Sequence, residues 1–221
     1  NRALSFAEEC GNLTFSANII TNIGGLFQEI ADFPRAIEYF GKALDLYQQL
    51  NNRIGISVTL CNVGLLYNTL SDSVRALENF NKAIAIDKEL GNEAGTARLY
   101  GNIGIVYFGN KDYLLALEYF SKALEMHTKL SNGRSMAINL NNIGNVYRAL
   151  SDFPQALEYY DKAREITEQL GMKSSKAEWL QRVGDIYANT GFEGFDHERA
   201  KEYLLEAMEI NLELGTLNKN A

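Results

Sequence analysis

The sequence predicts an all-α fold, a solenoid of tandem antiparallel helix pairs, because one unit recurs every 40 residues along the 221-residue chain. The first observation is a glycine column, formed by Gly24, Gly64, Gly104, Gly144 and Gly184. The second is an aromatic column with the same spacing, formed by Phe27, Tyr67, Tyr107, Tyr147 and Tyr187. A fixed period of this length is typical of repeat architectures, in which each unit packs only on its neighbours. We therefore expect the apolar surface to be buried between repeats and not in one central core.

Signals for helix ends divide each unit into a first and a second helix, called helix A and helix B. Aspartates that can accept hydrogen bonds from the free N–H groups of a first turn stand at the expected start of helix B: Asp32, Asp72, Asp112, Asp152 and Asp196. Helix B is predicted to end at Leu50, Leu90, Leu130, Leu170 and Leu214. The residues that follow, mostly types that tolerate a left-handed backbone, are Asn51, Gly91, Ser131, Gly171 and Gly215. Pro34 and Pro154 fall in the first turn of helix B, where a missing N–H is harmless.

The glycine column lies in the middle of helix A, where glycine costs about 0.5–1 kcal/mol relative to alanine. A glycine in every repeat therefore requires an offsetting gain, and close packing of helix A on helix B provides one. The small partners expected on helix B are Ala36, Ala76, Ala116, Ala156 and Ala200. The larger side chains expected to fill the space beside them are Phe40, Phe80, Phe120, Tyr160 and Leu204. These columns are the predicted core.

The opposite side of helix B carries a Glu followed four residues later by a Lys. These pairs are Glu38–Lys42, Glu78–Lys82, Glu118–Lys122 and Glu158–Lys162. Pairs of this spacing and order stabilise a helix by about 0.2–0.5 kcal/mol each. They indicate a solvated outer face.

The period also predicts the boundaries of the units within one continuous solenoid domain. We expect the second helix of a truncated repeat at 1–11, five repeats at 12–51, 52–91, 92–131, 132–171 and 172–215, and a tail at 216–221. Residues 2–6 align with 42–46, which indicates a fragment of a larger protein. The fifth repeat has four more residues than the others in its A–B turn, within GFEGFDHE. The tail contains no capping helix, so either further repeats follow or the last helix stays partly bare, which favours pairing with another chain.

The spacing of hydrophobic, glycine, aromatic and alanine residues resembles that of the tetratricopeptide repeat, a helix–turn–helix unit. In the fourth unit the matching residues are Leu140, Ile143, Gly144, Tyr147, Ala156, Tyr160 and Ala163. The common unit of that family has 34 residues and a Pro near its end, whereas the period here is 40 and that Pro is missing. The chain is thus most similar to a longer-helix branch that includes kinesin light chains, bacterial quorum-peptide receptors and repeat regions of bacterial signalling enzymes. The resemblance implies a right-handed superhelix whose A helices line a concave groove.

The acidic composition excludes several classes of partner. The net charge is −7 and the pI is about 5.0, which argues against a nucleic-acid or anionic-membrane surface. No apolar run approaches the roughly 20 residues of a membrane helix, and no secretory leader precedes the first repeat. Cys10 and Cys61 lie on different predicted helices without metal-ligand spacing, which fits reduced thiols in the cytoplasm.

No combination of residues predicts catalysis, a cofactor or a metal. The Gly-Asn-Ile-Gly sequence at 101–104 lies in mid-helix, without the strand and the Gly-Lys-Ser/Thr of a phosphate-binding loop. His127 and His197 are far apart in the repeat frame, and lone surface histidines are the better interpretation. Trp179 precedes a core leucine and is predicted to pack. The sequence therefore favours a protein that is not an enzyme.

The resemblance assigns the candidate binding residues to the exposed face of helix A. The groove column is Asn22, Asn62, Asn102, Asn142 and Arg182, and the flanking candidates are Asn18, Arg98, Phe108, Asn145 and Arg148. An asparagine presents both a donor and an acceptor, so a column of amides can bind the backbone of an extended peptide whatever its sequence. In the alternative, each Asn bonds the neighbouring repeat and fixes the stacking angle. The arginines can engage a carboxylate, although they are too sparse for a carboxylate clamp.

Three functions remain open from the sequence. The first is a non-catalytic module that binds an extended peptide or a partner helix in its groove. The second is the regulatory region of a larger bacterial signalling enzyme, such as a nucleotide cyclase or histidine kinase. The third is a structural spacer or an oligomerisation scaffold, with a homodimer through exposed end helices as one form of it.

Overall fold

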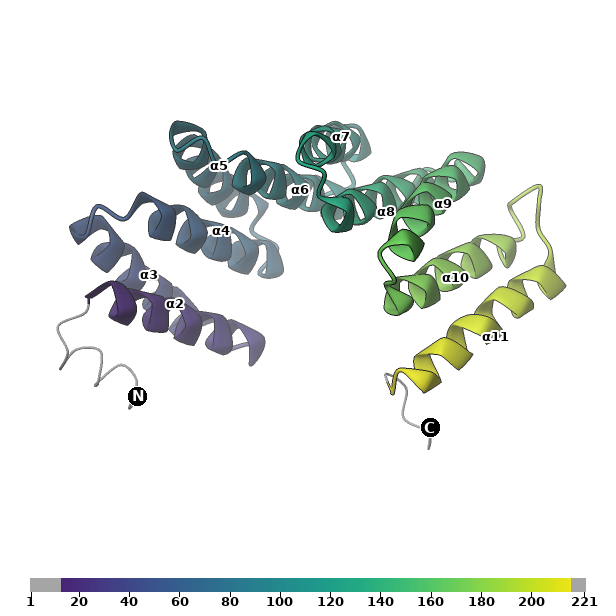
Figure 1. Cartoon of the computed structure of the whole chain (residues 1–221), viewed down its shortest axis with the longest axis horizontal. Helices are drawn as coiled ribbons and strands as arrows, with labels where there is room; N and C mark the ends of the chain where they lie inside the picture. The colour runs from purple at the N-terminus through teal and green to yellow at the C-terminus, as the bar shows by residue number, and fades with distance from the viewer. Residues whose placement is uncertain (1–12, 216–221) are drawn as a thin grey trace. The chain divides into compact units, whose positions relative to one another are not determined.

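The computed structural model describes residues 13–215, and its regular structure there is entirely helical, arranged in consecutive pairs (Figure 1). The helices are α2 (Leu13–Glu29), α3 (Phe33–Gln49), α4 (Arg53–Thr69), α5 (Ser73–Glu89), α6 (Glu93–Gly109), α7 (Tyr113–Lys129), α8 (Gly133–Ala149), α9 (Phe153–Gln169), α10 (Lys173–Tyr187) and α11 (His197–Glu213). The even-numbered helices are the predicted A helices and the odd-numbered ones the B helices. The all-α helix-pair fold is thus confirmed. The helix expected at 1–11, Cys10 and the tail at 216–221 lie outside the described residues.

The predicted helix ends are confirmed. Each of the five aspartates precedes a B helix, and its side chain accepts a hydrogen bond from the backbone N–H three residues later. Each B helix ends at its predicted leucine. The next residues have φ of 51° at Asn51, 66° at Gly91, 53° at Ser131, 67° at Gly171 and 70° at Gly215. The same left-handed conformation also follows four A helices, at Ala31, Ser71, Lys111 and Ser151, which the sequence did not predict.

The chain divides into two compact units, and the boundary between them lies between Val106 and Tyr107, near the end of α6. The first unit buries clusters such as Ala36, Phe40 and Leu66, contributed by α3 and α4. The second buries Ala116 and Phe120 of α7 with Ile143 and Val146 of α8, and Ala156 and Tyr160 of α9 with Val183 and Ile186 of α10. Within each unit, therefore, a B helix buries its small and aromatic residues against the next A helix. The single continuous domain stays a prediction.

Close packing of helix A on helix B at the glycine column is confirmed. A Cβ added to Gly64 would lie 2.5 Å from the Phe80 ring, and one added to Gly144 would lie 2.6 Å from the Tyr160 ring. The Cβ added to Gly144 would also lie 3.3 Å from the backbone carbonyl oxygen of Ala156, the small partner expected there. The bulky side chain of helix B thus occupies the space that the glycine leaves open. Because that side chain is fully buried, it has little room to move.

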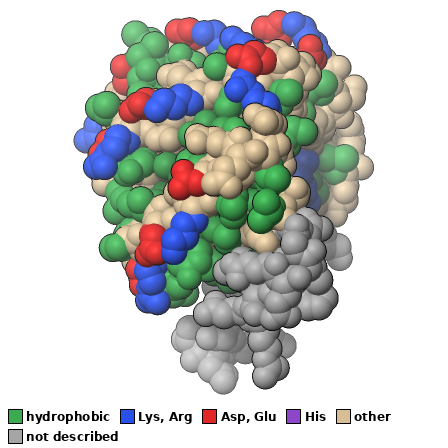
Figure 2. All heavy atoms as spheres, turned by 90° about the vertical axis from the view of Figure 1, so that its left-hand side faces the viewer, with side chains coloured by type: hydrophobic (Ala, Val, Ile, Leu, Met, Phe, Trp, Pro, Cys, Tyr) green, Lys and Arg blue, Asp and Glu red, His purple; other side chains and the backbone are tan. Residues whose placement is uncertain are grey.

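The outer side of helix B is charged, as expected. All four Glu–Lys pairs form ion pairs, with N–O distances of 2.5–2.6 Å. Figure 2 shows one face of the molecule, on which Lys or Arg side chains lie beside Asp or Glu side chains. Next to these pairs, aromatic residues of helices A and B stack, for example Tyr107 on Tyr119 with ring centroids 5.5 Å apart and Tyr147 on Tyr159 at 5.4 Å. The Glu and Lys side chains are exposed on this outer surface, where each ion pair contributes little.

The fifth repeat has the longer A–B turn that the sequence predicts. α10 ends at Tyr187 and α11 begins at His197. Phe192 from this turn packs on Tyr187 and also reaches Phe153 of α9, with centroid distances of 5.9 and 5.4 Å. The insertion therefore adds an aromatic contact between repeats 4 and 5.

The prediction that His127 lies on the surface is wrong, while His197 is exposed as expected. His127 is only 4% exposed, and its Nδ1 atom has no hydrogen-bond partner among the described residues. It occupies the column of Tyr47, Asp87 and Thr167, all of them buried. Since Asp87 and Thr167 are polar, the sequence of this column gives no signal of burial. Burial lowers the pKa of His127, because it disfavours the charged imidazolium.

Stability is expected to fall as the pH falls below about 6.5, the ordinary histidine pKa. His127 has a lower pKa in the folded chain than in the unfolded chain, so between the two values the unfolded state binds more protons. We expect His127→Gln to flatten the fall in melting temperature, followed by circular dichroism, between about pH 7.5 and about pH 5.5. His197→Gln, at an exposed site, serves as the control and should keep the fall. An unchanged pH dependence in His127→Gln would contradict the prediction.

Candidate functional site

The predicted groove residues all lie on A helices, and none is fully buried. The first unit holds Asn18 and Asn22 on α2, Asn62 on α4, and Arg98 and Asn102 on α6. The second unit holds Phe108 at the end of α6, Asn142, Asn145 and Arg148 on α8, and Arg182 on α10. Asn22 is exposed, whereas the other members of its column are half-buried.

The hydrogen bonds of the asparagines bear on the two hypotheses for their role. Asn22, Asn62 and Asn142 make no side-chain hydrogen bond within the described part of the chain. Asn102 differs, since its Nδ2 donates to the Sγ atom of Cys61 on the preceding A helix, at 3.4 Å. Asn18 accepts from the Tyr47 hydroxyl with its Oδ1, at 2.6 Å. Among residues 13–215, three of the four column amides thus have no hydrogen-bond partner, and one contacts the neighbouring repeat.

A hollow of about 230 Å³ in the second unit brings several candidates together. Its lining comes from the A helices α6, α8 and α10, from the start of α9 and from the turns that follow α8 and α10: Phe108, Asn145, Arg148, Ala149, Ser151, Phe153, Asp185, Ile186 and Asn189. Phe108, Asn145 and Arg148 were predicted. Ser151 and Asn189 were not, because helix A was expected to end before them.

A buried tyrosine bonds to one of the residues that line this hollow. The Tyr160 hydroxyl donates to Oδ1 of Asn145 at 2.7 Å, which leaves the Asn145 Nδ2 group for other partners. Burial raises the pKa of Tyr160, and the nearby Arg148 and Arg182 partly oppose that rise. The phenol therefore stays neutral and keeps its donor role at neutral pH.

Arg182 lies at the edge of this region. Its Nη2 atom pairs with Glu178 at 3.2 Å, and its guanidinium lies 5.9 Å from the centre of the Tyr160 ring. Its Nη1 atom is buried and has no partner among the described residues. The region thus holds two guanidinium groups and an amide, with the carboxylate of Asp185 close by.

The first unit contains a hollow at the same place in the repeat. It measures about 490 Å³ and is lined by Gly25, Gln28, Glu29, Ala31, Phe33, Phe40, Asn62 and Thr69. The positions of Gln28 and Glu29 correspond to Arg148 and Ala149 in the second unit. The two hollows therefore share a location and differ in charge.

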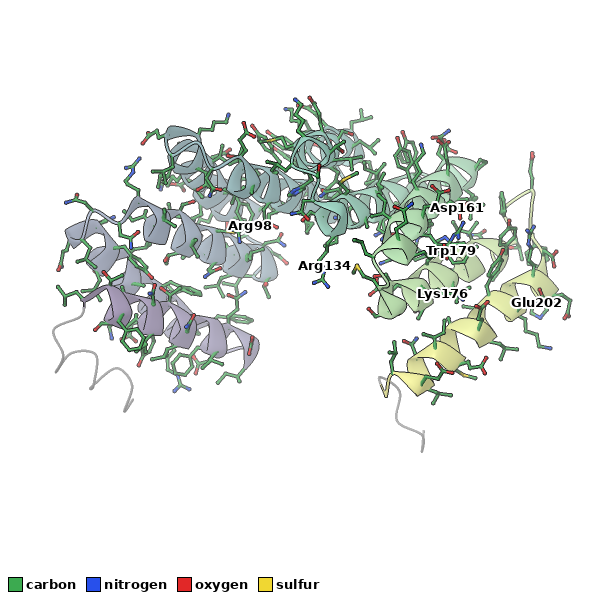
Figure 3. All side chains as sticks on the ribbon, in the orientation of Figure 1. Arg98, Arg134, Asp161, Lys176, Trp179 and Glu202 are labelled. Atoms are coloured by element: carbon green, nitrogen blue, oxygen red, sulfur yellow. The ribbon has the colours of Figure 1, made fainter. Side chains whose placement is uncertain are left out.

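Other candidates lie outside both hollows. Arg98 is exposed on α6, and its charge opposes the rise in the Cys61 pKa that burial causes. Trp179 of α10 packs, as predicted: its ring lies 5.7 Å from Tyr203 of α11 and 5.0 Å from the Arg164 guanidinium of α9. Figure 3 labels both Arg98 and Trp179. Trp179 thus belongs to the packing between repeats.

Residues 13–215 contain neither a metal-binding cluster nor a membrane-spanning helix. No group of three or more His, Cys, Asp or Glu residues there could hold a metal ion. Among the same residues, no helix combines the length and the apolar character that a membrane span requires.

Several solved structures have the same fold. BtubC (BKLC) from P. vanneervenii matches with a TM-score of 0.82 and 20% identity, over 100% of this chain and 91% of that one. Aspartyl phosphate phosphatase F from Bacillus subtilis matches with a TM-score of 0.83 and 18% identity, over 96% of this chain and 55% of that one. A Rap protein complexed with competence and sporulation factor matches with a TM-score of 0.76 and 17% identity, over 91% and 55%. At these identities the matches show the fold alone. No curated protein matches the sequence.

The sequence also matches a protein-family model over most of its length. The model described as tetratricopeptide repeat matches residues 15–89, 95–169 and 135–213. These matches extend over nearly all of the described helices, in agreement with the helix pairs and the glycine column. The chain therefore belongs to the tetratricopeptide repeat family.

Proposed function

We propose that this chain is a non-catalytic module that binds an extended peptide segment of a partner protein on the exposed face of its A helices. The tetratricopeptide fold is typical of protein-interaction modules. The Rap structure, which holds competence and sporulation factor, is an example of a similar fold bound to a partner. A cytoplasmic protein is the setting we propose, since Cys61 is a free, buried thiol.

The observation that carries the proposal is the hollow of about 230 Å³ in the second unit. It is open to solvent and combines apolar residues with Asn145, Arg148 and Asn189. Ligand sites commonly have this character, with an apolar lining and a few polar groups that fix orientation. An apolar side chain of the peptide would contact Phe108 and Phe153.

The polar groups suit a peptide backbone. Asn145 retains its Nδ2 donor, because only its Oδ1 is used by Tyr160. Asn142, one turn earlier on α8, makes no side-chain hydrogen bond to another described residue. Amides can bind the N–H and C=O groups of an extended segment, and Arg148 adds a charged donor for a carbonyl or carboxylate oxygen. The different lining of the hollow in the first unit would add selectivity for another part of the segment.

A double variant tests this site. We expect Asn142→Ala combined with Arg148→Ala to weaken the binding of peptides selected from a displayed library by roughly tenfold or more, because hydrogen bonds to charged groups contribute about 1.5–3 kcal/mol. Neither side chain is buried, so helicity and melting should stay unchanged. Dissociation constants measured by fluorescence anisotropy would report the loss.

The matched control removes an outer-face pair of the same unit, Glu118→Ala combined with Lys122→Ala. These residues form an ion pair on α7, away from the hollow, and the control should bind as the parent does. Equal binding by the groove variant and the parent would refute the site. Failure of the parent to select any peptide would refute the proposed function.

A further inference from the structure

The longer A–B turn of the fifth repeat contacts the candidate site in the second unit. Phe192 from this turn packs on Phe153 of α9, with ring centroids 5.4 Å apart and an angle of 59° between the rings. Phe153 is one of the residues that line the hollow of about 230 Å³, and so is Asn189, the second residue after the end of α10. The turn therefore contributes to the site directly through Asn189 and indirectly through the ring that packs on Phe153.

Hydrogen bonds within the turn order its extra residues. The N–H of Asp196 donates to the carbonyl of Tyr187 at 3.0 Å, which is the bond that also closes the shorter A–B turns. Asn189 accepts twice, with its Oδ1 from the N–H of Gly191 at 2.9 Å and with its carbonyl from the N–H of Phe192 at 3.0 Å. The insertion thus keeps the usual closure and adds an ordered loop to it.

The ring of Phe192 has three neighbours that hold it in place. It packs on Tyr187 of α10, with ring centroids 5.9 Å apart, as well as on Phe153. A Cβ added to Gly194 would lie 2.6 Å from the Phe192 ring, so the ring also contacts the backbone of its own turn. Phe192 therefore connects α9, α10 and the turn.

Phe153 differs from its equivalents in the other repeats. It is 7% exposed, whereas Phe33, Ser73 and Tyr113, at the same position of helix B, are half-buried. The A–B turn of the repeat that follows each of those three residues has the ordinary length and contains no aromatic residue. Since closely packed side chains have little room to move, the contact with Phe192 fixes the Phe153 ring as a wall of the hollow.

The volume of the hollow indicates what can enter beside a fixed wall. Pockets for drug-sized ligands measure about 300–1,000 Å³, so a hollow of about 230 Å³ suits a single side chain of a longer segment. Its apolar lining consists mainly of Phe108, Phe153 and Ile186. An aliphatic side chain such as that of leucine suits this space, whereas an indole ring would require Phe153 to move.

We infer that Phe192 is a positioning residue for the peptide site: by fixing Phe153, it makes the hollow select an aliphatic side chain over a larger aromatic one. The inference rests on the proposed function and names the class of segment, one with leucine, isoleucine or methionine as its anchor. Phe192 is not among the residues that line the hollow, so its effect passes through Phe153. Asn189 supplies a polar contact from the same turn.

The test uses a peptide selected on the parent from a displayed library. Its anchor is the apolar position whose change to alanine weakens binding to the parent but not to a Phe108→Ala variant, because Phe108 lines the hollow. Peptides with leucine and with tryptophan at that position are compared by fluorescence anisotropy. We expect the parent to prefer leucine by roughly tenfold or more, since one methylene group in a hydrophobic pocket changes specificity by about 10–200-fold. The Phe192→Ala variant should lose most of this preference.

Two further variants and the possible outcomes make the test specific. Phe192→Tyr retains the ring, and Phe195→Ala changes the other aromatic residue of the turn, so both should keep the preference of the parent. A merely structural role of Phe192 would weaken both peptides equally, so an unchanged preference in Phe192→Ala would overturn the inference while peptide binding stands. A parent that prefers tryptophan, or a selected peptide without such an anchor, would also overturn it. If the parent selects no peptide, the proposed function fails and the inference with it.

Discussion

Replacing Phe80 by alanine is expected to lower the free energy of unfolding by about 3–5 kcal/mol, the range for removing an aromatic ring from a protein core. Phe80 is fully buried on α5. Its ring lies where a Cβ of Gly64 would be, so α4 and α5 approach each other across this one side chain. The change removes the apolar contacts of the ring and leaves a cavity that two stacked helices can close only in part.

Urea unfolding followed by circular dichroism measures this loss. Phe195→Ala is the control, because Phe195 is half-exposed in the A–B turn of the fifth repeat and should contribute far less. In a repeat protein each unit is stabilised mainly by its neighbours, so we expect the loss to be greatest for the first unit, which contains α5. A loss below about 1 kcal/mol would show that the helices collapse into the space, contrary to close packing.

The parts of the fold that could be predicted depend on side chains with one dominant role. Asp32 and Asp72 cap their helices by accepting the backbone N–H of Arg35 and Arg75 with their carboxylates. A glycine column is favourable only where another helix packs closely against it. The 40-residue period then transfers each inference to every repeat. For this reason the helix pairs, the ends of the B helices and most of the core columns were predicted correctly, whereas Leu204, expected in the core, is 37% exposed on α11.

The left-handed residues after the A helices were missed for the opposite reason. Ala31 and Lys111 have φ of 57° and 63°, although neither residue type favours this region. Hydrogen bonds of the closing turn hold them there: Asp32 donates its N–H to the carbonyl of Phe27, and Asp112 to that of Tyr107. The backbone of the whole turn therefore determines these conformations, and a single residue type does not signal them.

The candidate site could be predicted only in part. The repeat frame placed Asn145 and Arg148 on the exposed face of helix A, and the structure adds Ser151 and Asn189 from beyond the predicted helix end. The burial of His127 was missed because its column also holds the polar residues Asp87 and Thr167, a pattern that does not predict a buried position. Hollows arise from the spacing of three helices, which a linear pattern does not contain.

Gly64 on α4 and Gly25 on α2, which occupy neighbouring columns of the repeat, are expected to respond to alanine in opposite directions. Gly64→Ala should lower the free energy of unfolding by roughly 1–3 kcal/mol, because the new methyl group would lie 2.5 Å from the buried Phe80 ring. Gly25→Ala should raise it by about 0.5–1 kcal/mol, because no atom lies within 4 Å of the new methyl group and alanine favours the helix. Urea titrations of the two variants and the parent measure both changes.

The pair separates two explanations for the glycine column. If glycine were present only to keep helix A flexible, both substitutions would stabilise the chain, since both positions lie inside helices of equal length. If glycine is required because the ring of helix B occupies the space of a Cβ, only the substitution at Gly64 destabilises the chain. The double variant Gly64→Ala/Phe80→Leu decides between them. The smaller leucine makes room for the new methyl group, so the loss of unfolding free energy in the double variant should be smaller than the sum of the losses in the two single variants. Strict additivity would contradict direct contact between the two positions.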